Sequence, residues 1–127
     1  MANVTRADVE RARATIGDRL PRTPMLSSRT LGARIKAELF QRTGSFKVRG
    51  ALNALARLPA DEPVVTASAG NHGLGIAYAA AELGRDATVV VPVTASPAKL
   101  AALERFPVTL VRHGLSYDEA ELHALEL

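Results

Sequence analysis

Apolar residues recur along this chain with two different periods, which predicts helices alternating with strands. A first helix is expected over residues 5–19, with Thr5 as its cap and Asp8 placed to complete a capping box. Its apolar face repeats every three to four residues, at Val9, Ala12, Ile16 and Leu20. The two prolines that follow, at 21 and 24, end this helix. Residues 25–38 carry a poor signal, and at most one short strand is expected there.

A second helix is predicted from Ser45, which can cap it, to the stop at Pro59. Its buried stripe would be Val48, Leu52, Leu55 and Leu58. The period then changes. Three short apolar runs are each typical of a buried strand, at residues 63–67, 87–91 and 108–111.

Helical patterns separate these three runs. After the first run comes a glycine-bearing turn, Gly70 to Gly75, and then a helix that ends at Gly84. The apolar residues of that helix would be Ile76, Ala80 and Leu83. A further helix is expected from Ser96 and Pro97 to Phe106, and a capping box of Ser116 and Glu119 opens a last one.

This alternation indicates the α/β class, with a parallel sheet and flanking helices joined by right-handed crossovers. Ligands of such sheets bind at the carboxyl ends of the strands. The turn after the first strand, residues 67–75, is therefore the expected site. Because the sequence ends inside an apparent helix, we expect the chain to be truncated.

The composition argues against several classes of function. The net charge is only +3, the basic residues are scattered, and 4% of residues are aromatic, with no Trp, so nucleic-acid binding is excluded. The chain has no Cys, and its three His form no ligand-spaced motif, so no metal site is expected. No signal peptide and no apolar run of membrane-spanning length is found. We therefore expect a cytoplasmic protein without a membrane partner.

The first motif that carries chemistry is QRTGSFKVRG at residues 41–50, where Lys47 lies in the opening turn of a helix beside Phe46. Most helical lysines are simply solvated, and a charged amine is a poor nucleophile. The positive end of the helix dipole and burial beside Phe46 would both favour the neutral amine, which Schiff-base chemistry requires.

The second motif is SAGNHG at residues 68–73, between an apolar strand and a helix. Its small residues allow close approach of an anion, to which the Ser68 hydroxyl and the amides of the helix start can donate. Asn71 adds a side-chain amide that can reach a phenolic or carboxylate oxygen. The same residue types also cap helices, so the loop alone leaves both interpretations open.

Together the two motifs resemble the fold-type II (tryptophan synthase beta-like) pyridoxal-phosphate enzymes, and most closely the threonine/serine dehydratase and serine racemase family. The resemblance extends to TPML at 23–26, KAE at 36–38 and SYDEA at 116–120. It implies a dehydratase, or ammonia-lyase, that converts L-threonine or L-serine to a 2-oxo acid and ammonia, with pyridoxal 5'-phosphate as cofactor and the amino acid as its small-molecule partner.

The resemblance also assigns roles to residues. Lys47 would bind the cofactor covalently and then shuttle the proton of the substrate's alpha carbon. Phe46 would pack near the cofactor ring and Asn71 would bond its phenolic oxygen. The substrate carboxylate would be held by the loop that matches Ser68, Ala69, Gly70, Asn71 and His72, in the last case through its amide.

Three departures from the family pattern qualify this assignment. Ala69 stands where racemases of the family carry a second serine, so elimination is expected rather than racemisation. Residues 31–36 are compressed where the family has more residues and an apolar strand, and Pro107 replaces a common glycine turn, which could shift the third strand. A serine racemase, another beta-elimination enzyme and a non-catalytic remnant or small α/β module stay as alternatives.

By the same resemblance, residues 1–63 would be the N-terminal part of a large cofactor-binding domain and residues 64–127 a small, incomplete α/β domain. The family's glycine-rich phosphate loop would come later than residue 127. We therefore expect this chain to be inactive alone. Bare apolar faces of a half-built sheet also favour association, so a homo-oligomer is a further expectation.

Overall fold

The computed structural model describes residues 3–127, and its first element is helix α1, Arg6–Ile16. Thr5 caps this helix as predicted. The Thr5 side chain accepts from the Asp8 amide and the Asp8 carboxylate accepts from the Thr5 amide, which completes the capping box. The helix ends three residues before the predicted position, because Gly17 takes a positive φ of 54°.

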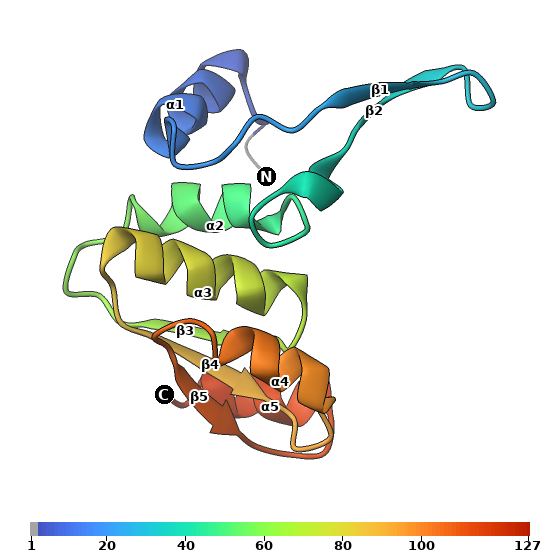
Figure 1. Cartoon of the computed structure of the whole chain (residues 1–127). Helices are drawn as coiled ribbons and strands as arrows, with labels where there is room; N and C mark the ends of the chain where they lie inside the picture. The colour runs from blue at the N-terminus through green and yellow to red at the C-terminus, as the bar shows by residue number, and fades with distance from the viewer. Residues whose placement is uncertain (1–2) are drawn as a thin grey trace.

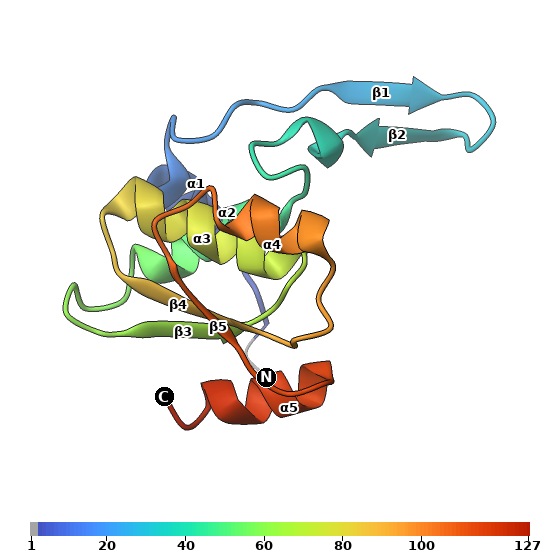
Figure 2. The same ribbon diagram turned by 60° about the horizontal axis from the view of Figure 1, so that its bottom comes forward.

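An antiparallel hairpin follows, made of β1 (Met25–Ser28) and β2 (Ala33–Lys36), with Gly32 at φ 58° in its turn. The expectation of at most one short strand here is wrong. Nearly every residue of the two strands is exposed, so no alternation of apolar and polar residues marks them in the sequence. Figures 1 and 2 show the hairpin extending away from the other elements. A 3-10 turn, η1 (Glu38–Phe40), leads back toward the helices.

Two helices then pack side by side, α2 (Lys47–Leu55) and α3 (Asn71–Leu83). Three of the four residues predicted to form the buried stripe of α2 are buried, but Leu58 lies beyond the helix and is 37% exposed. The predicted glycine turn up to residue 75 is also wrong in its extent. Helix α3 already begins at Asn71. Gly73 and Gly75 lie inside it, where they pack against neighbouring backbone, as described below.

The predicted parallel sheet is confirmed, in the order β3-β4-β5. Its strands are β3 (Val64–Ala67), β4 (Ala87–Val91) and β5 (Thr109–Arg112). Strand β5 lies one residue later than expected, after Pro107. Helices α3 and α4 cover one face of the sheet and α5 covers the other (Figure 2).

Both of the last two helices differ from the prediction: α4 is shorter, and the capping of both helices is different. Helix α4 (Pro97–Leu103) stops three residues before Phe106, and the Ser96 side chain makes no capping hydrogen bond. Helix α5 (Tyr117–Ala124) is capped by Ser116, which accepts from the Glu119 amide at 3.3 Å. The Glu119 carboxylate accepts from the Leu115 amide instead of the cap's own amide, so only half of the predicted capping box forms.

Two apolar clusters hold these elements together, and α3 contributes to both. One joins α2 and α3 to the start of β3 and includes Val48, Leu52, Ile76 and Ala79. The other joins α3 to β4 and α4 and includes Ala77, Val89, Val91, Leu100 and Leu103. Small residues on α3 let the neighbouring elements approach closely. Within residues 3–127, no helix is both long and apolar enough to cross a membrane.

Candidate active site

The two motifs singled out in the sequence meet where α2 and α3 begin. Both helices start at the same end of the molecule, as Figure 1 shows. A Cβ atom built on Gly75 would lie 3.1 Å from the Lys47 carbonyl carbon and 3.2 Å from the Val48 nitrogen, so the first turn of α2 rests on α3 at this glycine. Asn71 lies one helical turn, about 6 Å, before Gly75. The folding of the chain thus brings Lys47 beside the loop that opens α3.

The loop itself leaves the carboxyl end of β3, where ligands of parallel sheets are expected. Its start is fixed to the sheet, because the Ser68 amide donates to the Val90 carbonyl at 3.1 Å. The Ser68 hydroxyl accepts from the Gly70 amide at 3.2 Å and keeps its own hydrogen for another acceptor. A Cβ atom at residue 73 would overlap the Ser68 carbonyl oxygen, which explains the glycine there.

Helix α3 begins without a capping side chain. Its cap residue is Gly70, which has no side chain to accept hydrogen bonds from the first-turn amides. Those amides, including that of His72, are therefore open to an external acceptor, and the helix dipole favours a negative one. The side chains of Asn71 and His72 are exposed beside them. This arrangement can bind a carboxylate or a phosphate.

Lys47 is the first residue of α2, and its side chain is exposed. The Phe46 ring beside it is 61% exposed, so this ring does not bury the lysine. The Lys47 Nζ lies 5.3 Å from the Phe46 ring centroid, within cation-π distance. Ser45 is one position too early to be the cap residue, but its Oγ accepts from the Lys47 amide at 3.4 Å.

Ala69 differs from its neighbours in the loop. It is partly buried, and it packs against the cluster formed by α3, β4 and α4. Its methyl group brings no titratable or hydrogen-bonding function to the loop.

An ion pair near Lys47, between Glu38 and Arg49, is not indicated by either sequence motif. The Glu38 carboxylate accepts from Arg49 Nε at 2.7 Å and Nη2 at 2.9 Å, and from the Thr23 hydroxyl at 2.5 Å. Lys36 Nζ lies 3.9 Å away. The Arg49 hydrogen bond is the main reason that the pKa of Glu38 falls from 4.5 to about 2. Arg49 follows Lys47 by two residues, so this ion pair ties the start of α2 to the N-terminal segment.

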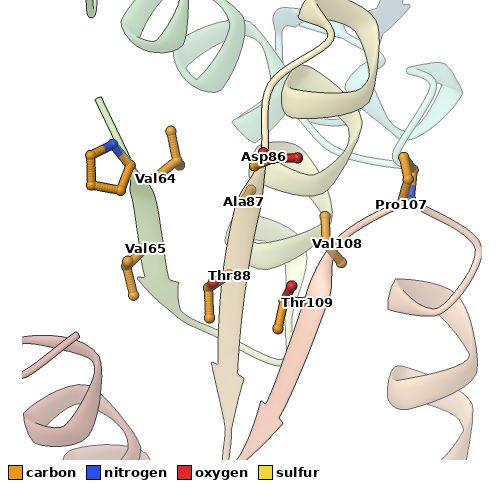
Figure 3. Close-up of a pocket in the computed structure, with 9 residues that line it drawn as sticks. Val64, Val65, Asp86, Ala87, Thr88, Pro107, Val108 and Thr109 are labelled. Atoms are coloured by element: carbon orange, nitrogen blue, oxygen red, sulfur yellow. The ribbon is translucent and has the colours of Figure 1, made fainter. Parts of the chain in front are cut away.

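Two of the cavities in the structure lie elsewhere. One, of about 330 Å³, lies at the amino ends of the strands, as Figure 3 shows, whereas the candidate loop follows the carboxyl end of β3. It is lined by Pro63, Val64, Val65, Asp86, Ala87, Thr88, Pro107, Val108 and Thr109. The second, of about 450 Å³, lies between α1 and residues 20–22. Neither includes Lys47 or the Ser68 to His72 loop, which form an open surface.

A lysine at one helix start beside an anion-binding loop at another, at the carboxyl end of a parallel strand, fits enzymes that bind pyridoxal phosphate through a lysine. Residues 16–127 match the family described as pyridoxal-phosphate dependent enzyme, and the chain belongs to this family. Its fold is that of the fold-type II members.

Individual relatives agree with this assignment. The chain is 45% identical over 117 residues to serine racemase of Mus musculus, and 38% identical over 134 residues to the catabolic L-threonine dehydratase of Staphylococcus aureus. These alignments cover 83% and 98% of the chain, and 34% and 39% of the relatives. The chain thus spans about a third of the length of these relatives.

A solved structure confirms the fold. The processed form of threonine deaminase isoform 2 from Solanum lycopersicum superimposes with a TM-score of 0.84 at 35% identity, over 92% of this chain and 35% of that one. The donors present here fit the family's cofactor chemically, because an exposed lysine amine suits its aldehyde and uncapped helix amides suit an anion.

Proposed function

We propose that this chain provides the cofactor lysine and the substrate-binding loop of a pyridoxal-phosphate-dependent dehydratase for L-threonine or L-serine, which releases a 2-oxo acid and ammonia. The observation that carries the proposal is the contact of Lys47 with α3 at Gly75, one turn from the loop that opens α3. The chain's membership in the enzyme family supports it.

Lys47 has two tasks in this proposal. Its Nζ would hold the cofactor through the cofactor's aldehyde, and as a free amine it would take the proton from the substrate's alpha carbon. The bound cofactor supplies the electron sink that makes this proton acidic. Phe46, next to Lys47, would pack near the cofactor ring, and the Asn71 side-chain amide would donate to the phenolic oxygen.

The substrate carboxylate binds to the loop of Ser68, Ala69, Gly70, Asn71 and His72. The Ser68 hydroxyl has a hydrogen to donate, since its oxygen already accepts from Gly70. The first-turn amides of α3, with that of His72 among them, complete the donor set. The beta hydroxyl would leave as water with the proton taken from the alpha carbon, and hydrolysis of the resulting enamine by one water would give the 2-oxo acid and ammonia.

Racemisation is the second candidate, favoured by the 45% identity to a serine racemase. Racemisation needs an acid or base on each face of the substrate's alpha carbon. Ala69 brings none and packs against an apolar cluster, so we place elimination first. Formation of D-serine from L-serine by a holoenzyme containing this chain would reverse that order.

We also propose that residues 1–63 belong to a larger cofactor-binding domain and residues 64–127 to a smaller α/β domain. The two sheets lie on either side of this boundary. The chain spans about a third of the length of its relatives, and we infer from the family resemblance that the glycine-rich phosphate loop is supplied from outside these residues. We therefore expect the chain alone to release no 2-oxobutyrate from L-threonine. Turnover by the purified chain would contradict this.

Reductive labelling tests the role of Lys47. The purified chain is incubated with pyridoxal phosphate, reduced with borohydride, digested and analysed by peptide mass. The three lysines of the chain are Lys36, Lys47 and Lys99. We expect the label to concentrate on Lys47, and to disappear from residue 47 in Lys47→Arg while the exposed Lys99 keeps its background labelling. Equal labelling of Lys47 and Lys99 would refute the assignment.

A further inference from the structure

Gly75 lies in the interior of α3, where glycine is less favourable than alanine because it loses more backbone freedom on folding. Its φ is not positive, so the turn chemistry of glycine does not explain it. The explanation is steric. An added Cβ would lie 3.1 to 3.3 Å from the Lys47 carbonyl carbon, the Val48 nitrogen and the Lys47 carbonyl oxygen, all of them backbone atoms that cannot rotate away.

The start of α2 has little room to move away from such a methyl group. Val48 is fully buried and packs with Leu52, Ile76 and Ala79 in one cluster. On the side of the N-terminal segment, Arg49 is held by both oxygens of Glu38, at 2.7 and 2.9 Å. The main chain of Lys47 is thus held by α3 at Gly75 and by the Glu38 ion pair at Arg49.

From this geometry we propose that Gly75 and Arg49 are positioning residues for Lys47. They hold the main chain of Lys47 beside the Ser68 to His72 loop, so that the Lys47 amine can reach the cofactor aldehyde. The inference rests on the proposed function, because it assumes that Lys47 is the cofactor lysine. Neither residue is expected to contact the cofactor or the substrate.

The test uses the ratio of reductive labelling at Lys47 to that at the exposed Lys99. Gly75→Ala forces a shift of a few tenths of an ångström at the start of α2, and we expect the ratio to fall about fivefold, because reactivity depends steeply on the position of the reacting group. The matched control is Gly50→Ala, since Gly50 lies in α2 and an added Cβ there meets nothing within 4 Å.

Arg49→Lys tests the other contact independently of Gly75. It keeps the positive charge but loses the two-pronged hydrogen bond to Glu38, so the ratio should again fall. Its control is Arg57→Lys at an exposed position beyond α2. Circular dichroism establishes that each variant is folded, and if Gly75→Ala does not fold, the Arg49→Lys result decides.

The outcomes separate the two proposals. A reduced ratio in Gly75→Ala or Arg49→Lys, with both controls at the wild-type value, supports the positioning role. A wild-type chain labelled selectively at Lys47, with unchanged ratios in both variants, overturns the inference and leaves the proposed function standing. An unselective wild-type chain overturns the proposed function, and the inference with it.

Discussion

At the scale of single residues, Glu38 shows how one partly buried charge organises its surroundings. Its carboxylate receives hydrogen bonds from Arg49 and Thr23, and Lys36 lies near it. Its side chain is only 16% exposed, so water replaces little of this bonding if a partner is lost. The three partners come from three segments, and Glu38 therefore joins the hairpin, the N-terminal segment and α2.

We expect Glu38→Gln to lower the free energy of unfolding by about 1 to 3 kcal/mol at neutral pH, because Arg49 loses a charged acceptor. The pKa of Glu38 is about 2 in the folded chain against 4.5 ordinarily, so its stabilising effect is complete above pH 4.5 and is lost as the pH falls through about 2. The difference between the wild type and the variant should shrink over that interval.

Urea denaturation followed by circular dichroism at several pH values measures this difference. Glu10→Gln serves as the control, because Glu10 forms an exposed ion pair with Arg6 on α1 and its loss should change the stability by less than about 0.5 kcal/mol. A difference between Glu38→Gln and the wild type that stays constant down to pH 2 would show that the carboxylate charge is not the cause.

At the scale of elements, Arg85 connects the ends of the two helices whose starts form the candidate site. It follows Gly84, which ends α3 in a left-handed conformation. Its guanidinium donates to the carbonyls of Leu55 at 2.7 Å, Leu58 at 3.0 Å and Glu62 at 3.1 Å, and also to that of Pro59. These carbonyls belong to the end of α2 and to the connection that leads into β3.

Arg85→Met should therefore cost about 2 kcal/mol of stability, since several carbonyls lose a charged donor at once. Arg57→Met is the matched control at an exposed position in the same connection, and should change stability by less than about 0.5 kcal/mol. Chemical denaturation of both variants measures the effect. Equal stability of the two would mean that water replaces the Arg85 hydrogen bonds without loss.

The elements that the sequence predicted well are those whose pattern is local. Strand β4 was predicted at its observed bounds because four apolar residues and Thr88 run continuously between Asp86 and Pro92. The cap of α1 was predicted because Thr5 and Asp8 are three residues apart. The hairpin was missed because its strands are exposed. The start of α3 was misplaced because its glycines serve contacts with Ser68 and Lys47, which the local pattern does not reveal.

In the candidate site, too, the features that could be predicted are those that depend on residues close together in the sequence. Lys47 and the Ser68 to His72 loop could be found from motifs, since each motif is continuous in sequence. Whether Phe46 buries Lys47 could not be predicted, because burial depends on what packs over the ring. The pairing of Glu38 with Arg49 spans eleven residues and links η1 to α2, so no single helical or strand period relates the two side chains. Unusual glycines inside α3 were the one signal for the close contact at Gly75.

At the scale of the whole molecule, the hairpin of β1 and β2 extends away from the other elements. It is a separate two-stranded sheet, and both of its edges carry unpaired backbone groups. Met25, Leu26 and Ile35 are 47%, 48% and 42% exposed on it. Exposed apolar side chains on open strands favour pairing with another chain, and isolated hairpins are only marginally stable in water.

We therefore expect the purified chain to associate as its concentration rises, through this hairpin. Leu26 and Ile35 are directly opposite each other across the two strands, so Leu26→Lys with Ile35→Glu places an attractive charge pair on one face and removes its apolar surface. The double variant should sediment as a monomer at concentrations where the wild type does not. The control is Leu122→Lys, which adds a charge at an exposed position of α5, far along the chain from the hairpin. If all three sediment alike, the hairpin is stable without a partner, and its apolar residues do not drive association.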